Sequence, residues 1–376
     1  MTKTLILTAG FGEGHNAAAR NLAAAIESMA GTGSSSVADL FALASPRTNR
    51  AARRAYLAAI NGAPRLWSAF YTWVDRRRIL PRHLWLLRAE TRALQALLLR
   101  EHPGVVCSTY PIYGFLLERQ ARAGLLTAPF YNIVTDSISI NSLWTRPACA
   151  GWFVPNEETA EVMRGMGVPA GRLHVLGFPV PSFFNDHAHE FAPPDLASGA
   201  PPRVLYIVHS GVRHAWAIAR RLLAETDWEL TFAVGRDERL RRRLEPLAAA
   251  RARPAHVLGW TDEIPRLLMT HHAVISKAGG ATTQEAIAAR CPMFVNQIVP
   301  GQEEGNYELL RRRHASVLVE TPEAAIAALR LAFANQGSVW RQWRAALVPL
   351  ARPDASHAIA AHLISKALRT PFAISS

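Results

Sequence analysis

The stretch AVISKAGGATTQEA, residues 273–286, decides the fold class of this chain. A short apolar run is followed by the glycine pair Gly279 and Gly280, and helix-forming residues continue from Thr282. Glycines that connect an apolar strand to a helix are typical of the nucleotide-binding turn of a parallel α/β sheet, where free helical N–H groups bind phosphate. The stretch therefore predicts an α/β fold and a pyrophosphate site where the helix begins at Thr282.

Polar residues close to this turn complete a candidate nucleotide-sugar site. Glu285 falls in the first turns of the expected helix, where a carboxylate can accept hydrogen bonds from ribose hydroxyls. The segment PGQEEGN, residues 300–306, follows another expected strand and a Pro-Gly turn, so we expect it at the carboxyl edge of the sheet. Gln302 and Glu303 offer donors and acceptors for sugar hydroxyls. The alternative is that the glycines only form turns and Glu285 is a helix-start charge.

The same alternation of short apolar runs and helical stretches fills both halves of the 376-residue chain and predicts two Rossmann-like domains facing a cleft. We expect an N-terminal domain over residues 1–180, a C-terminal domain over 181–353 and a terminal helix within 354–376 that packs back on the N-terminal domain. A proline-rich linker covers 177–203. The expected strands are Thr4–Thr8, Val105–Ser108, Tyr131–Val134, Trp152–Val154, Val204–Val208, Leu230–Val234, Val257–Leu258, Ala273–Ile275 and Met293–Asn296.

A second glycine-rich turn follows the first expected strand. Gly10, Gly12 and Gly14 precede a helix expected to begin near Asn16, and they allow backbone N–H groups to approach an anion or an acceptor. Their spacing differs from the dinucleotide fingerprint GxGxxG, which disfavours a nicotinamide cofactor. His15 lies where the turn meets the helix and can bind a phosphate, orient an acceptor or exchange a proton; the alternative is a polar helix-start residue without a catalytic role.

These motifs resemble the monogalactosyldiacylglycerol synthases and processive diacylglycerol glucosyltransferases of glycosyltransferase family 28. The resemblance extends over most of the chain and is more distant to the N-acetylglucosaminyltransferase of peptidoglycan synthesis. It depends on the order of five segments: GFGEGHNAAA from Gly10, VTD at 134–136, GFPV at 177–180, SKAGGATTQEA from Ser276 and PGQEEGN from Pro300.

The resemblance implies a glycosyltransferase B-type (GT-B) fold that binds a UDP-sugar mainly through its C-terminal domain. Its motifs assign the diphosphate to Gly280, Ala281 and Thr282 beside Gly279, the ribose to Glu285, and the sugar to Gln302 and Glu303, with Asn306 in the same motif. They assign catalysis to His15 on the Gly12 and Gly14 loop. Asp136 is a weaker candidate for orienting the acceptor or accepting its proton.

The chain departs from the family pattern at two places. Ile140 to Trp144 replaces the His-Pro pair that the plant synthases carry before the tryptophan, which leaves the acceptor site open. Residues 208–214, VHSGVRH, contain one glycine where relatives are often glycine-rich. His209, Ser210 and Arg213 are reasonable phosphate-facing replacements there.

Composition favours anionic partners. The 42 Lys and Arg exceed the 29 Asp and Glu, giving a formal charge of +13. Arginines are numerous between Arg47 and Arg100, where Trp67, Phe70 and Tyr71 share helical spacing, so we expect this segment to bind an anionic membrane surface; an ordinary core-packing helix with solvated arginines is the alternative. The three cysteines are widely spaced and suggest neither a metal site nor a disulfide framework.

We therefore expect an inverting transferase that moves a hexose from UDP-glucose or UDP-galactose to a membrane lipid, most simply diacylglycerol, without a cofactor or a metal. We expect it in the cytoplasm on the inner face of the membrane, since no leader or spanning stretch is present. The alternatives are another acceptor on the same fold, or a UDP-sugar 2-epimerase. A nucleic-acid-binding protein is disfavoured, because the arginines are dispersed without a binding motif.

Overall fold

A computed structural model describes residues 3–47, 49–50, 84–209, 214–299 and 303–367. Its contacts divide the chain into two compact units, each treated separately below. Unit 1 comprises Met1–Ser182, Pro300–Gly305 and Asp354–Ser376, and unit 2 comprises Phe183–Val299 and Asn306–Pro353. The chain therefore crosses between the units more than once.

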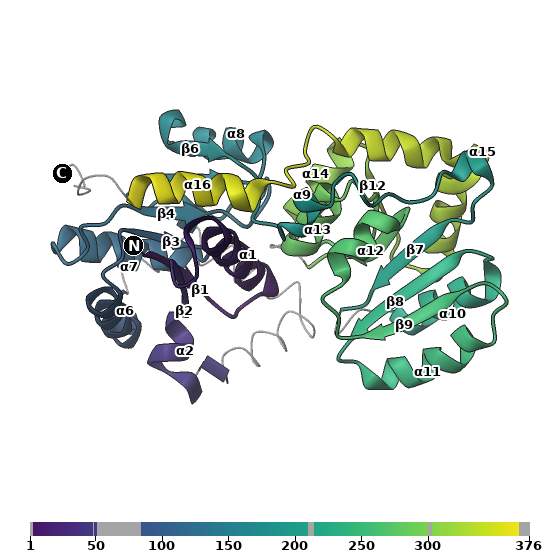
Figure 1. Ribbon diagram of the computed structural model, residues 1–376, viewed down its shortest axis with the longest axis horizontal. Helices are drawn as coiled ribbons and strands as arrows, with labels where there is room; N and C mark the ends of the chain where they lie inside the picture. The colour runs from purple at the N-terminus through teal and green to yellow at the C-terminus, as the bar shows by residue number, and fades with distance from the viewer. Residues whose placement is uncertain (1–2, 48, 51–83, 210–213, 300–302, 368–376) are drawn as a thin grey trace. The chain divides into compact units, whose positions relative to one another are not determined.

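Unit 1 contains a parallel six-stranded sheet in the order β2-β1-β3-β4-β5-β6 (Figure 1). Because β2 lies on one side of β1 and β3 on the other, the direction of winding reverses between β1 and β3. Ligands of doubly wound sheets bind at such reversals, beyond the carboxyl ends of the strands. The strands are β1 (Thr4–Thr8), β2 (Ser35–Asp39), β3 (Val105–Ser108), β4 (Phe130–Ile133), β5 (Gly151–Val154) and β6 (Leu173–Val175).

Helices cover both faces of this sheet. On one face Ile6, Val105 and Cys107 pack with α1 (Glu13–Ala30) and with α16 (Ala355–Ala367), the helix contributed by the far end of the chain. Leu5 and Leu7 point to the other face, as strand alternation requires. The helices of that face are α2 (Leu40–Ala44), α6 (Arg88–Glu101), α7 (Pro111–Arg122) and α8 (Glu157–Gly165), with 3₁₀ turns at Leu84–Leu87, Ser142–Trp144 and Ala170–Arg172.

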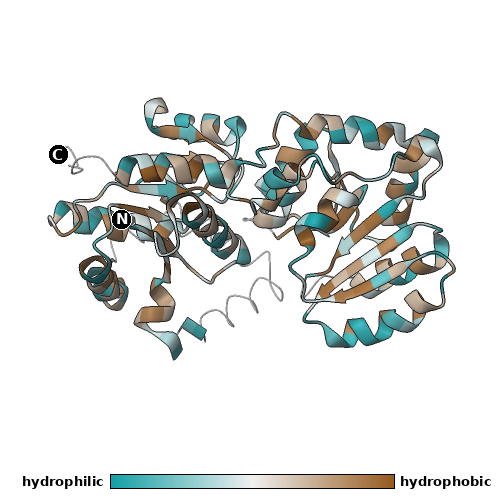
Figure 2. Ribbon diagram, in the orientation of Figure 1, coloured by the Kyte–Doolittle hydropathy of each residue, from teal (hydrophilic) through white to brown (hydrophobic). Residues whose placement is uncertain are grey.

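Unit 2 repeats this architecture with the order β12-β11-β10-β7-β8-β9, in which the winding reverses between β7 and β10. This is the six-strand order of dinucleotide-binding domains. Figure 2 shows hydrophobic strands and a strongly hydrophilic outer helix α11. The strands are β7 (Arg203–Ile207), β8 (Glu229–Gly235), β9 (Ala255–Gly259), β10 (Ala273–Lys277), β11 (Met293–Gln297) and β12 (Ser316–Leu318).

The helices of unit 2 bury the sheet between them. A large hydrophobic cluster joins the strands to α10 (Ala215–Glu225), α11 (Glu238–Ala249) and α15 (Pro322–Leu347), which is interrupted by non-helical backbone between Ala334 and Gly337. Helix α12 (Ile264–Thr270) contacts β7 and α13 (Gly280–Ala288). The remaining elements are α9 (Phe183–Asp186), a 3₁₀ turn at Leu196–Ser198 and α14 (Glu304–Arg312), whose residues from Asn306 onward belong to this unit.

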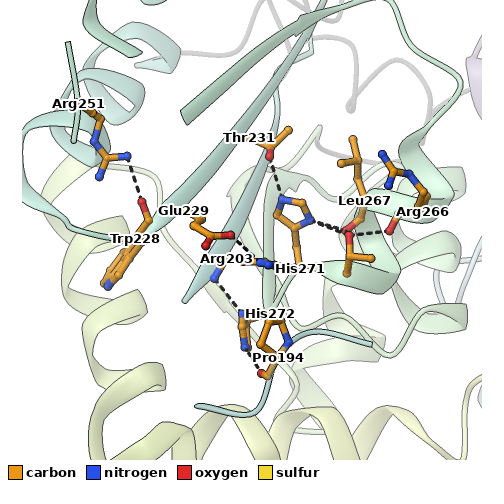
Figure 3. A network of polar contacts seen from close by, with 11 residues as sticks. Pro194, Arg203, Trp228, Glu229, Thr231, Arg251, Arg266, Leu267, His271 and His272 are labelled. Atoms are coloured by element: carbon orange, nitrogen blue, oxygen red, sulfur yellow. Dashed lines mark hydrogen bonds and ion pairs between the residues drawn. The ribbon is translucent and has the colours of Figure 1, made fainter. Parts of the chain in front are cut away.

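Two adjacent buried histidines join the start of β7 to the chain that precedes it (Figure 3). His272 accepts a hydrogen bond from the Arg203 N–H at Nδ1 (2.9 Å) and donates from Nε2 to the Pro194 carbonyl (2.8 Å). His271 donates from Nδ1 to the Leu267 carbonyl (2.7 Å), which leaves Nε2 to accept from the Thr231 hydroxyl (2.9 Å). His272 therefore needs to be neutral to make both of its hydrogen bonds, and burial favours the neutral form of His271 by lowering its pKa to about 4.

The two Rossmann-like folds and the nine expected strands are confirmed, with bounds that shift by one or two residues. Three further strands, β2, β6 and β12, were not expected, because their sequences SSVAD, LHV and SVL are short and offer little apolar signal. Two expected helix starts were wrong: α1 begins at Glu13 and α13 at Gly280. The first turns of α1 and α13 contain glycine or acidic residues, which have a weak helix propensity. They are helical all the same, because the backbone geometry of a helix start outweighs that propensity.

Candidate functional site

In unit 1 the loops after β1, β3 and β4 meet at His15, beside the winding reversal. The ring atom Nδ1 of His15 lies 3.0 Å from the Thr135 hydroxyl, which follows β4. The backbone carbonyl of His15 accepts a hydrogen bond from the Thr109 hydroxyl (3.1 Å), which follows β3. His15 is thus held on two sides in the first turn of α1, with Gly12 at the N-cap position and Gly14 inside the helix.

The surroundings of His15 favour its neutral form. Burial lowers the pKa of His15 to about 4, and a hydrogen bond with the Thr109 backbone opposes this shift only in part. The ring lies edge-on to Tyr110, with centroids 5.2 Å apart, and 6.4 Å from the ring of Trp144. A neutral imidazole at pH 7 can accept a proton or a hydrogen bond, which is what a general base requires.

Asp136 lies in the same loop as Thr135 and is fixed by a tryptophan. The Trp144 indole N–H donates to Asp136 Oδ2 (2.7 Å), and the Trp152 indole N–H donates to the Trp144 carbonyl (2.6 Å). Burial raises the pKa of Asp136 to about 6, while the hydrogen bond from Trp144 lowers it. His15 and Asp136 therefore share Trp144 as a neighbour, and their pKa values are shifted in opposite directions.

Asp39 supports the glycine loop, a role that the sequence analysis missed. Its Oδ2 accepts a hydrogen bond from the Gly10 N–H (2.9 Å) and its Oδ1 caps α2 at the Ala42 N–H (3.0 Å). The carboxylate thus ties the loop after β1 to the helix after β2. The signal was present as an Asp before an apolar helical stretch, but β2 was not expected there.

An aromatic cluster lies beside the same loop. Phe11 packs edge-on against Phe41, with ring centroids 5.3 Å apart, and stacks on Tyr110 at 6.3 Å. The Tyr113 hydroxyl oxygen accepts a hydrogen bond from the Phe41 N–H (3.2 Å), which fixes Phe41. Phe11, Phe41 and Tyr110 are partly exposed. They place an apolar wall within the neighbourhood of His15.

In unit 2 the N-terminus of α13 lies beyond β10, at the winding reversal. Gly279 is the extended N-cap residue, no side chain caps the helix, and the Gly279 N–H is used in a tight turn to the Lys277 carbonyl (2.8 Å). The first bond of the helix runs from the Thr283 N–H to the Gly279 carbonyl (2.9 Å). The N–H groups of Gly280, Ala281 and Thr282 therefore precede the helical ladder, as in helix termini that bind anions.

The other expected donor residues take different positions. Asn306 is buried and donates from Nδ2 to the Ala278 carbonyl (3.0 Å), so it braces the turn before α13. Glu303 is buried and Glu285 is partly exposed, and each has an interaction partner. Contacts assign Glu303 to unit 1 and Glu285 to unit 2. Ser210, Arg213 and Gln302 lie outside the described residues.

His209 and Ser276 connect the ends of β7 and β10. His209 Nε2 lies 3.0 Å from the buried Ser276 hydroxyl. Burial, and to a smaller extent the charge of Lys277, lowers the pKa of His209 to about 3, so this ring is neutral at pH 7. It can exchange hydrogen bonds but does not bring a positive charge to the α13 turn.

Two exposed residues at this carboxyl edge were also missed. Trp260 follows β9, has 71% of its surface exposed, and lies under the Arg236 guanidinium, 5.1 Å from the ring centroid. Arg236 follows β8. An exposed tryptophan beside a strand end can stack on a planar ligand group, but a lone GW pair in the sequence carries little signal.

In the parts of the chain that the structure describes, no three His, Cys, Asp or Glu side chains are grouped so that they could hold a metal ion. A search of the same residues finds no helix of the length and apolar character needed to cross a membrane.

Solved structures share this fold at low sequence identity. Staphylococcus aureus MnaA bound to UDP aligns over 100% of both chains with a TM-score of 0.61 and 12% identity. Acinetobacter baumannii MurG aligns over 96% of this chain and 99% of its own, with a TM-score of 0.61 and 15% identity. The UDP-GlcNAc 2-epimerase of Neisseria meningitidis aligns over 97% and 100%, with a TM-score of 0.58 and 11% identity. The fold is thus of the GT-B type.

The amino-acid sequence gives a narrower match. Residues 15–180 match the family of monogalactosyldiacylglycerol (MGDG) synthase. The processive diacylglycerol beta-glucosyltransferases of Bacillus cereus (strain B4264) and Bacillus anthracis (strain A0248) are each 26% identical to this chain, over 321 and 325 residues, covering 84% of it and 82% of their own length. In sequence the chain is thus similar to MGDG synthase over residues 15–180 and to the processive diacylglycerol beta-glucosyltransferases over most of its length.

Proposed function

We propose that this protein is an inverting glycosyltransferase that moves a hexose from a UDP-sugar to the hydroxyl of a membrane lipid, diacylglycerol being the leading acceptor. The observation that carries the proposal is His15: a histidine kept neutral by burial, held by Thr135 and Thr109 at the point where the sheet of unit 1 reverses. The names of the relatives supply the reaction and the acceptor class. MGDG synthase-like sequence in residues 15–180 includes this histidine.

We assign the donor to unit 2. The N–H groups of Gly280, Ala281 and Thr282 beside Gly279 are oriented to bind the diphosphate, since no side chain caps the helix that they begin. Glu285 is assigned to the ribose, and Asn306 braces the turn through the Ala278 carbonyl. Trp260 and Arg236 offer a planar surface for the base at the same strand edge. The family motifs add Gln302 and Glu303 for the sugar and Ser210 and Arg213 for phosphate oxygens.

The reaction needs one base and a stabilised leaving group. The acceptor oxygen forms a bond to the anomeric carbon while the bond from that carbon to the UDP oxygen breaks, which inverts an α-linked donor into a β-glycoside. The acceptor proton passes to His15 or to Asp136, both of which are available as bases at pH 7 from the stated pKa directions. The diphosphate leaves with its negative charge against the α13 N-terminus.

A lipid acceptor fits the apolar wall beside the base. Phe11, Phe41 and Tyr110 offer apolar surface close to His15, and Asp39 holds the loop of Phe11 in place through Gly10. Gly12 and Gly14, at the start of α1, are assigned to the loop that binds the acceptor or a phosphate. We also propose that the segment from Arg47 to Arg100 binds the anionic cytoplasmic face of the membrane; most of it lies outside the described residues.

The test supplies UDP-glucose, UDP-galactose and UDP-N-acetylglucosamine separately, with dioleoylglycerol in mixed micelles, and follows organic-soluble product by mass spectrometry. NMR of the product should give a β-anomeric configuration. His15→Ala should abolish turnover while UDP affinity, measured by calorimetry, stays within about twofold. The control His189→Ala removes an exposed histidine and should be fully active. An α-linked product refutes inversion, and conversion of UDP-N-acetylglucosamine into its 2-epimer without lipid product refutes the transferase.

A further inference from the structure

A cavity of about 250 Å³ lies within unit 2, away from the N-terminus of α13. It is formed by the opposite end of α13, by α12, by the segment that begins with α9 and by the end of α15. Two of the four places where the chain passes between the units, after Ser182 and after Pro353, flank this segment and this helix end. The lining residues are Phe184, Ala188, Phe191, Met269, Ala288, Ala289, Arg290, Arg344, Val348, Ala351 and Pro353.

Two arginines give the cavity a positive charge that no carboxylate of its lining balances. Arg290 and Arg344 are both partly buried, and neither side chain makes a hydrogen bond or an ion pair with a residue in the described ranges. The lining contains no Asp or Glu. Arg344 lies over the Trp340 ring, 5.5 Å from its centroid. Partly buried guanidinium groups are usually paired with an anion.

Helix ends account for part of the placement of both arginines. Arg290 follows the C-terminus of α13, where a cation is favoured by the exposed helical carbonyls. Arg344 lies in the last turn of α15, where the end carbonyls of that helix favour a cation in the same way. Partial burial lowers the pKa of Arg344, Cys291 opposes this shift, and the charge of Arg290 adds a smaller lowering, so the two positive charges repel each other. A bound anion would remove this repulsion.

The rest of the lining is apolar. Phe184 and Met269 are buried side chains, and Phe191 and Val348 continue the surface toward solvent. At roughly 30 Å³ for each water-sized group, 250 Å³ accommodates about eight such groups. This is the size of one small charged head and a few methylene groups. A multiply charged polar molecule would leave its polar atoms against phenyl and aliphatic surface.

We propose that this cavity binds an anionic amphiphile, with a phosphate or carboxylate head at Arg290 and Arg344 and a short apolar chain against Phe184, Phe191 and Met269. The site is separate from the proposed donor site, because it lies at the other end of the nine-residue α13. It does not depend on the proposed transfer reaction. Bidentate hydrogen bonding from each guanidinium supplies specificity for the head, and burial of the chain supplies affinity.

Calorimetry on the full chain tests the proposal with monooctyl phosphate, octanoate, 1-octanol and inorganic phosphate, all below micellar concentration and with saturating UDP present. Monooctyl phosphate, octanoate or both should bind at least tenfold more tightly than octanol and inorganic phosphate, and a comparison of the two octyl anions identifies the preferred head. Arg290→Gln and Arg344→Gln should each weaken binding at least tenfold. Arg344→Lys keeps the positive charge and should weaken binding less than Arg344→Gln does. Arg341→Gln, an exposed arginine on the same helix, is the matched control.

Filling the cavity provides an independent variant. Ala351→Phe introduces bulk into the lining without changing charge, and it should also weaken binding at least tenfold while circular dichroism and UDP affinity are retained. Unchanged affinity in Arg290→Gln, Arg344→Gln and Ala351→Phe would place the amphiphile elsewhere and overturn the proposal. Equal affinity for octanol would remove the role of the arginines, and equal affinity for inorganic phosphate would remove the role of the apolar wall.

Discussion

The pH dependence of the reaction distinguishes the two candidate bases. His15 and Asp136 have opposite shifts: the pKa of His15 is lowered to about 4 and that of Asp136 is raised to about 6, in both cases mainly by burial. A base is active in its unprotonated form, so each candidate loses activity as the pH falls through its own pKa. The acid limb of kcat/KM for the free enzyme therefore reports which group has to be unprotonated.

The two outcomes differ by almost an order of magnitude at pH 5. A carboxyl with a pKa of about 6 is roughly 91% ionised at pH 7 and about 9% ionised at pH 5, which predicts a loss of about tenfold. A histidine with a pKa of about 4 is still roughly 90% neutral at pH 5, which predicts a loss below about 1.2-fold. We expect the smaller loss, because His15 is the better-placed base in the loop contacts described above.

The assay measures initial rates of lipid glycosylation between pH 4.5 and 8 at low acceptor concentration. A sample kept at pH 5 and then assayed at pH 7 controls for unfolding. Asp136→Asn should retain the same acid limb if His15 is the base, although its turnover falls through loss of the Trp144 contact. A midpoint near 6 in the wild-type enzyme that disappears in Asp136→Asn would contradict the assignment to His15 and transfer the role to Asp136.

Three further predictions follow from individual contacts. Glu285→Ala should weaken UDP binding about tenfold by calorimetry with an unchanged melting temperature, and an unchanged affinity would remove Glu285 from the ribose site. Burial lowers the pKa values of His271 and His272 to about 4, so the stability that depends on their neutral forms is complete above pH 6.5 and is lost as the pH falls. At pH 5 each histidine should lower the free energy of unfolding by about 2 kcal/mol. In urea unfolding, His272→Gln should reduce the loss of stability between pH 7 and pH 5, and an unchanged loss would show that protonation of His272 is not coupled to folding. Because of the Arg47 to Arg100 segment, the amount of protein that floats with vesicles should depend on anionic lipid and should fall as salt rises. Equal flotation with neutral vesicles in high salt would exclude an electrostatic mechanism.

The fold was largely predictable, because buried parallel strands are read directly from short apolar runs. β1 and β3 agree with the expected Thr4–Thr8 and Val105–Ser108. β2 was not predictable in the same way: it is an edge strand that buries only the small side chains of Ser35 and Ala38 and exposes Val37. Its neighbour β1 supplies the pairing that the sequence alone does not reveal.

The candidate site was predictable where a motif places residues on one loop, and less so where it depends on contacts between loops. His15 and Asp136 could be selected, but the hydrogen bond of Asp136 to Trp144 and the contact of His15 with Thr135 join separate segments. Asp39 was missed for the same reason, since its partner Gly10 is 29 residues away. Asn306 was expected at the ligand, whereas its described hydrogen bond is to the Ala278 backbone.

The position of α16 has a consequence for synthesis of the protein. One face of the first sheet is covered jointly by α1 and by Ile359, Ala360 and Leu363 of α16. A ribosome adding about 5–20 residues per second needs roughly 10–40 s to proceed from residue 180 to residue 367. During that interval the nascent N-terminal half has Ile6, Val105 and Phe153 only partly covered, although its other helices are already made. The N-terminal half therefore depends on its own distant helix, and its exposed apolar face is where chaperones or aggregation would act first.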